Sequence, residues 1–198
     1  MTFKTTLLAA LSMPCLALAE SATPPSSQVK RGEYLVAFGG CHDCHTPKKM
    51  GPKGPELDTD RLLSGHPEQM PVTPAPALQG PWLAATVGTM TAWSGPWGIS
   101  YTANLTPDRE TGLGAWTEQN FVDTMRTGRH MGRGRPILPP MPWQMIGKLT
   151  DQDLRAVFAY LRTIPALKNR VPQPTPPAAV TAPTANATPS PSTPAPAN

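Results

Sequence analysis

Charged and aromatic residues are both scarce in this chain of 198 residues: 15% are Asp, Glu, Lys or Arg, and 6% are Phe, Trp or Tyr. The net charge is only +4 and no dense run of Lys and Arg occurs, which argues against a nucleic-acid-binding protein. No apolar stretch beyond the N-terminus approaches the ~18 residues that a membrane span needs. With so few aromatic side chains, a core of ordinary size is weakly supplied unless a non-protein group completes it. The length suits one domain with flanking segments.

Proline, in contrast, is abundant, with 27 residues. The segment 171–198 contains nine of them and no charged residue, so it cannot bury enough apolar surface to offset the entropy of ordering it. We therefore predict a disordered Pro/Ala/Thr-rich tail over 171–198. Two interpretations of the tail stay open, a tether or spacer and a dispensable extension.

The N-terminal segment 1–19 is typical of an export signal. Lys4 supplies the positive start, an apolar stretch runs from Leu7 to Leu18, and Ala17-Leu18-Ala19 forms a small-residue cleavage site. Acylation of Cys15 is disfavoured because Pro14 precedes it. The sequence thus predicts a periplasmic protein with an N-terminal linker over 20–27, a folded domain over 28–170 and no transmembrane segment after cleavage.

The string Cys41-His42-Asp43-Cys44-His45 has the pattern of a c-type haem attachment site. Two thiols three positions apart can add to the two vinyl groups of one haem, and the following His45 is then carried beneath the ring as an iron ligand. Structural zinc would need a second ligand pair, whereas the remaining histidines, His66 and His130, are isolated. Thiol–disulfide chemistry would be expected in βαβ surroundings, which this sequence lacks.

Three helices are predicted around this motif from capping residues and apolar spacing. The first carries Tyr34, Leu35 and Phe38 on one face, and the last has an apolar stripe from Leu154 to Ile164. Capping residues mark the start of each helix and a Gly or Pro marks its end. The first helix is predicted between Ser26-Ser27 and Gly39-Gly40, the second between Thr117 and Gly128, and the third between Thr150 and Pro165.

Residues 46–80, which follow the haem motif, are rich in Gly and Pro, and we expect them to be irregular. Thr86–Trp93 is strand-like and alternation continues over 99–105, so a β-hairpin is predicted around Gly95-Pro96-Trp97-Gly98. Trp82, Trp93 and Trp97 are interpreted as local packing of this insertion, with a haem-edge or docking role as the alternative.

Several motifs together give the chain a family resemblance. They are Arg31–Leu35, Cys41–His45, Asn104–Asp108, Glu110–Gly114 and Leu138–Trp143. Over most of residues 29–170 the chain is similar to class I c-type cytochromes, in particular to haem domains of cytochrome subunits of bacterial periplasmic and membrane-bound dehydrogenases. The resemblance implies an all-α cytochrome c fold around one covalent haem, with the loop-rich insertion added. It also implies that the first and last helices cross, so that Tyr34 and Leu35 meet Tyr160 and Leu161. Such subunits usually carry several haem motifs, whereas this chain has one.

Met141 is the candidate for the sixth iron ligand. Pro139, Pro140 and Pro142 stiffen its loop, which lies just before the last helix, where the family places its distal methionine. Met145 and the pair His130/Met131 remain alternatives. We also expect His45 to donate its second ring N–H to a carbonyl, with Pro107 as the candidate acceptor.

A His/Met pair fills both axial positions, which favours reversible one-electron transfer. The sequence therefore predicts a non-catalytic electron-transfer protein, either a stand-alone carrier or the single-haem cytochrome subunit of a dehydrogenase complex, that links a dehydrogenase to a terminal oxidase or another cytochrome. The alternative is a haem enzyme or gas sensor with an open distal site. Two basic groups could steer an acidic redox partner or could simply be solvated, and one arginine, or Trp143, could hold a haem propionate. These groups are Lys48, Lys49 and Lys53, and Arg126, Arg129, Arg133 and Arg135.

Overall fold

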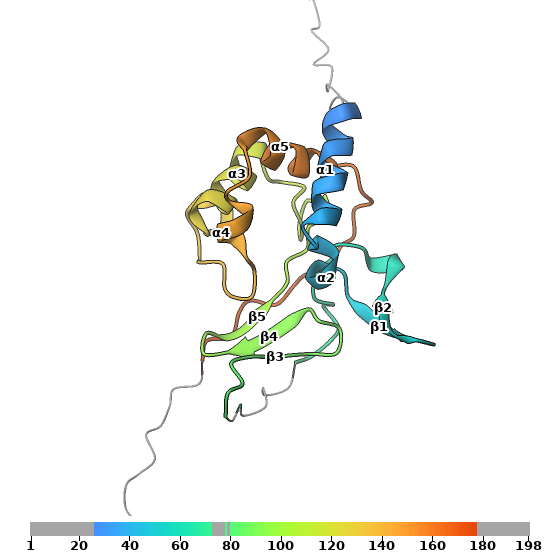
Figure 1. Cartoon of the computed structure of the whole chain (residues 1–198), viewed down its shortest axis with the longest axis vertical. Helices are drawn as coiled ribbons and strands as arrows, with labels where there is room; N and C mark the ends of the chain where they lie inside the picture. The colour runs from blue at the N-terminus through green and yellow to red at the C-terminus, as the bar shows by residue number, and fades with distance from the viewer. Residues whose placement is uncertain (1–25, 73–77, 79, 178–198) are drawn as a thin grey trace, which may run out of the picture.

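The computed structural model describes residues 26–72, 78 and 80–177. The predicted export signal, residues 20–25 of the predicted linker and positions 178–198 of the predicted tail lie outside this part. Helices gather at one end of the molecule and the small sheets at the other, with the short helix α2 at their junction (Figure 1). The α-helices are α1 (Ser26–Phe38), α2 (Cys41–His45), α3 (Glu118–Thr127), α4 (Trp143–Ile146) and α5 (Asp151–Leu161). Two 3₁₀ turns are η1 (Thr59–Arg61) and η2 (His130–Gly132).

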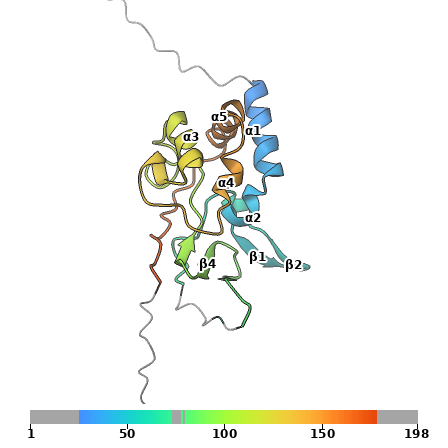
Figure 2. The same cartoon turned by 60° about the vertical axis from the view of Figure 1, so that its left-hand side comes forward.

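Helices α1 and α5 cross at close range, as the resemblance implies. A Cβ atom at Gly32 would lie 1.9 Å from the carbonyl oxygen of Ala156, so glycine lets the two backbones approach. Leu35 and Leu161 are buried beside the crossing. The expected contact of Tyr34 with the last helix stays a prediction: this ring is 56% exposed and stacks on Phe38, with ring centroids 5.9 Å apart. Figure 2 shows α1 and α5 side by side from a second direction.

Capping explains where α3 and α5 begin. The Thr117 hydroxyl accepts from the backbone N–H of Asn120, whose side chain in turn accepts from the N–H of Thr117, and Gly128 ends the helix in the left-handed conformation. Thr150 caps α5: its hydroxyl accepts from the backbone N–H of Asp153. Both predicted helices are confirmed, whereas Ser26 and Ser27, expected as caps, lie inside α1.

The helices enclose one apolar core, in which Phe121 of α3 and Phe158 of α5 lie 5.5 Å apart between ring centroids. Its buried members are Leu35, Val36, Leu63, Leu113, Phe121, Val122, Met125, Leu154, Val157, Phe158 and Leu161. None of the described helices is both long enough and apolar enough to cross a membrane.

Among the described residues, five strands form two antiparallel sheets, so the prediction of an all-α protein is wrong. Helices account for 33% and strands for 14% of the structure. One sheet pairs β1 (Lys48–Gly51) with β2 (Gly54–Leu57), and the other has the order β3 (Ala85–Thr86), β4 (Ala92–Gly95), β5 (Gly98–Tyr101). The predicted hairpin is confirmed as β4–β5, but the stretch expected as one strand over Thr86–Trp93 is divided between β3 and β4. The β1–β2 hairpin went unpredicted because it buries no residue and so has no apolar alternation.

The segment that follows α5 returns to the sheet. Thr175 exchanges two backbone hydrogen bonds with Ile99 of β5, of 2.8 and 2.9 Å between nitrogen and oxygen. This contact lies within 171–198, where the tail is predicted, so β5 has a backbone partner on both edges over this stretch (Figure 1). The domain boundaries as a whole stay a prediction.

We expect Gly32→Ala to destabilise the protein by about 2 kcal/mol, because the added methyl group forces α1 away from α5. Thermal unfolding followed by circular dichroism measures the change. Gly88→Ala is the control, since a Cβ atom there meets nothing within 4 Å and the residue has no positive φ. Equal stability of both variants would show that the close crossing is not required.

Candidate haem-binding site

The thiols and the first imidazole of the site lie on one helical turn. Gly40 adopts the left-handed conformation (φ 64°) and turns the chain from α1 into α2, which carries Cys41, Cys44 and His45. Both cysteines are free thiols and half-buried. Cys41 also packs against the apolar core. Positions 41, 44 and 45 lie on adjacent faces of a helical turn, so one planar group can engage all three.

His45 is buried, and its ring orientation is fixed by one hydrogen bond. Its Nδ1 lies 2.8 Å from the carbonyl oxygen of Ala103. Because a carbonyl only accepts, Nδ1 must carry the proton, which leaves Nε2 with a free lone pair in the neutral ring. Burial lowers the pKa of His45, although the Ala103 carbonyl opposes this shift. The expected donation to a carbonyl is confirmed, and its acceptor is Ala103 rather than Pro107.

Thr46 ties the chain after α2 to the interior. Its side chain is fully buried, and its Oγ1 accepts a 2.9 Å hydrogen bond from the backbone N–H of Leu63. The Nδ1 atom of His42 lies 2.9 Å from the same oxygen. The carbonyl of His45 accepts from the N–H of Gly65 at 2.8 Å. The backbone N–H groups of Leu63 and Gly65 therefore hold Thr46 and His45, the last residue of the haem motif.

Asn169 in turn holds that stretch and was missed by sequence reasoning. Its buried amide donates to the carbonyls of Ser64 and His66 and accepts from the N–H of Glu68 at 2.9 Å. In the sequence, Asn169 is only a polar residue after the last helix. Nothing in that pattern indicates a hydrogen-bond partner more than 100 positions away.

Met141 lies in the loop between η2 and α4 and packs against the same apolar core as Cys41. Of the alternative ligands, Met145 on α4 is 72% exposed. The ring of His130 packs edge-on against Trp116, with centroids 4.9 Å apart, and neighbouring Met131 has a positive φ of 52°. Met141 as the iron ligand stays a prediction. It is supported by the packing of Met141 and Cys41 against the same apolar core.

The structure also bears on the two non-haem interpretations of the cysteines. Burial raises the pKa of Cys41 to about 11 and raises that of Cys44, so neither thiol is activated as a redox dithiol requires. His66 is engaged on both ring nitrogens: Nε2 donates to the Met70 carbonyl, and Nδ1 accepts from the Thr91 hydroxyl. It has no lone pair free for zinc.

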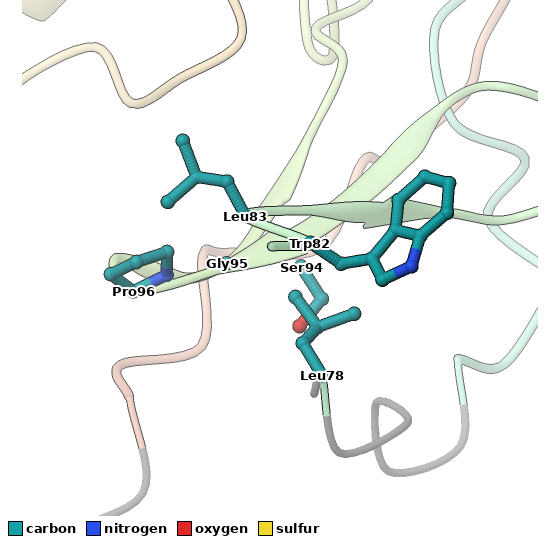
Figure 3. A pocket seen from close by; sticks show the side chains of 6 residues that line it. All are labelled: Leu78, Trp82, Leu83, Ser94, Gly95 and Pro96. Carbon is teal, nitrogen blue, oxygen red and sulfur yellow. The ribbon is translucent and has the colours of Figure 1, made fainter. Parts of the chain in front are cut away.

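The three tryptophans of the insertion differ in their surroundings. The ring of Trp97 lies over Gly95, and the indole nitrogens of Trp93 and Trp97 are enclosed by protein, which agrees with local packing. Trp82 is 73% exposed and lines an open pocket beside β4, and its ring extends away from Pro96 (Figure 3).

The basic side chains differ in whether they bind a carboxylate or a backbone carbonyl. Lys49 pairs with Asp58, and Arg126 with Asp151. Arg129 and Arg135, in the chain that leads to Met141, donate instead to the backbone carbonyls of Gly134 and Pro136. The ring of Trp143 packs against Gly128. A propionate contact of Trp143 or an arginine stays a prediction.

No protein-family model matches the chain. A nicotinate dehydrogenase subunit of Pseudomonas putida is 26% identical over 171 residues, which cover 82% of this chain and 11% of that protein. The cytochrome c subunit of quinone-dependent alcohol dehydrogenase of Gluconobacter oxydans is 28% identical, covering 73% and 23% respectively. The gluconate 2-dehydrogenase cytochrome c subunit of Pantoea cypripedii is 29% identical, covering 67% and 22%. This chain is similar to the cytochrome c subunits of dehydrogenases. It spans less than a quarter of the length of these three relatives.

The residues present fit the haem c that similarity to cytochrome c subunits implies. Two free thiols lie one helical turn apart, a buried imidazole presents an unprotonated Nε2, and a thioether packs on the same core. Imidazole and thioether are ligands that iron accepts in c-type cytochromes.

Thr46→Val should lower the free energy of unfolding by about 1–3 kcal/mol, because valine keeps the side-chain shape but leaves the buried N–H of Leu63 without its acceptor. Chemical denaturation provides the measurement. Thr163→Val is the control: its hydroxyl bonds to the Tyr160 carbonyl at an exposed position, and we expect a change below about 0.5 kcal/mol. Equal losses in both variants would contradict the role given to Thr46.

Proposed function

We propose that this protein is an exported, periplasmic one-electron carrier with one covalent c-type haem. Cys41 and Cys44 form the thioether bonds, His45 is the proximal iron ligand and Met141 the distal one. The observation that carries the proposal is the orientation of His45: its Nδ1–H is committed to Ala103, and its Nε2 is thereby left for iron on the turn that holds both thiols. Similarity to cytochrome c subunits supports an electron-transfer role.

Bound haem supplies an iron centre that cycles between the ferric and ferrous states. The protein's part is to keep the coordination the same in both. The buried bond from His45 to Ala103 fixes the plane of the imidazole. The proline-flanked loop limits the conformations open to Met141, whose soft thioether favours ferrous iron. With His45 and Met141 holding the iron, the haem would have no position left for a substrate and would supply one-electron transfer.

We further propose that the donor is a dehydrogenase and the acceptor a terminal oxidase or another cytochrome. The similar proteins support this, because their names describe cytochrome subunits of alcohol, gluconate and fructose dehydrogenases. A relative from Cereibacter sphaeroides is a dihaem protein. This sequence has three cysteines and one Cys-x-x-Cys-His motif, which supports a single haem. Arg129 and Arg135, which precede Met141 in the chain and donate to backbone carbonyls of their own loop, could steer an acidic partner.

Met141→Ala tests the distal ligand. The oxidised wild-type protein should show the near-infrared charge-transfer band of methionine bound to iron, and the variant should lose this band and bind carbon monoxide rapidly when reduced. Met145→Ala is the matched control one helical turn away and should keep the band. A wild-type protein that is high-spin and binds carbon monoxide without mutation would point instead to a haem enzyme or gas sensor.

Electron transfer itself is tested by mixing the purified oxidised protein with a dehydrogenase purified from the same cell. After substrate is added, stopped-flow spectroscopy should record complete one-electron reduction of the haem. The second-order rate should fall as salt is raised from about 10 mM to 150 mM, because screening weakens electrostatic steering. Failure of every periplasmic dehydrogenase to reduce the protein, together with turnover of peroxide, would overturn the carrier proposal.

A further inference from the structure

The chain segment 98–103 contacts both sides of the candidate haem site. At its end, the carbonyl of Ala103 accepts from His45. Three residues earlier, the Ser100 hydroxyl donates to the carbonyl of Pro139 with 2.5 Å between the oxygens. Pro139 lies two residues before Met141. One extended segment thus touches the proximal imidazole and the loop that carries the distal methionine.

Ser100 is held in a rigid setting. It lies in β5, where it pairs with Trp93 of β4, and its side chain is buried at 7% exposure. On the opposite edge of the strand, the preceding residue, Ile99, is bonded to Thr175 through both backbone groups. Because β5 has a backbone partner on each side, the sheet fixes the backbone of Ser100. Its hydroxyl lies 2.5 Å from the Pro139 carbonyl and 3.4 Å from the Trp93 carbonyl, so Pro139 is the closer acceptor.

The Met141 loop has few anchors of its own. Its three prolines have no backbone N–H to donate. The N–H of Ile137 bonds to Gly128 before the loop, and the N–H of Trp143 bonds back to the Met141 carbonyl after it. Within the described part of the chain, the hydroxyl of Ser100 provides the hydrogen bond that joins Pro139–Met141 to the sheet.

We infer that Ser100 is a positioning residue for the distal iron ligand: its hydrogen bond to Pro139 keeps the Met141 thioether on the iron. The inference rests on the proposed His45/Met141 ligation. Loss of the hydroxyl would leave a carbonyl next to a buried side chain without its donor, so the loop would gain freedom to move away. Met141 would then dissociate more often, and external ligands would reach the iron.

The decisive comparison is between Ser100→Thr and Ser100→Val in the haem-loaded full-length protein. The two replacements have the same shape and the same preference for strands, and differ only in the hydroxyl. Imidazole binding to the oxidised protein, followed by loss of the methionine–iron band, is the readout. We expect Ser100→Val to bind imidazole about tenfold more tightly than Ser100→Thr, as the loss of one ordinary hydrogen bond implies. The pH at which the band disappears should fall by about one unit in the valine variant.

Ser94→Ala, also in this sheet, is the control and should leave both readouts at wild-type values, which separates a general loosening of the sheet from loss of this hydrogen bond. Equal imidazole affinity and equal band stability in the threonine and valine variants would overturn the role of Ser100 while leaving the proposed function intact. A wild-type protein without the band would overturn the proposed function, and the assignment of Ser100 with it.

Discussion

The hydrogen bond between His45 and Ala103 is the constraint on which the candidate site depends. Helix α2 has five residues, too few to be stable by themselves, so its geometry must come from tertiary contacts. The Ala103 carbonyl fixes the imidazole, and Thr46 fixes the chain one residue later. The stretch that receives Thr46 is held by Asn169. The short motif is thus supported from three distant parts of the sequence.

The core explains why a protein so poor in aromatic residues can fold around this site. Eleven buried apolar residues form the centre, and further apolar residues pack against it while staying partly exposed. Among the latter are both a haem-motif cysteine and the candidate distal ligand. They are Cys41, Leu105, Trp116, Met141, Ile146, Leu149, Tyr160 and Ile164. Such a layer is what a bound porphyrin could cover, which agrees with the expectation that a non-protein group completes the core.

Features encoded by neighbouring residues were predictable, and features made by distant polar partners were not. The start of α3 at Thr117, its end at Gly128 and the β4–β5 turn each follow from local rules of capping and turn chemistry. The β1–β2 hairpin has no buried face and so left no alternating pattern in the sequence; together with the β3–β5 sheet it makes the all-α prediction wrong. Ala103, Ser100 and Asn169 act through single hydrogen bonds to remote backbone groups, which leave no periodic signal in a sequence. The Cys-x-x-Cys-His motif was recognisable in the sequence because covalent haem attachment, where it occurs, requires this spacing.

The distribution of these hydrogen bonds favours a carrier over an enzyme with an open distal site. An electron carrier works best when its coordination does not change with oxidation state, so both ligands need rigid support. In the proposed site, Ala103 would support the proximal ligand His45, and the prolines together with Ser100 would support the distal ligand Met141. An enzyme or sensor would need the distal side to admit a ligand, and a loop tied to the sheet beside a proline-flanked methionine opposes this. Because β5 contains Ser100 and leads to Ala103, the insertion that lengthens this chain belongs to the proposed site rather than being an addition to it.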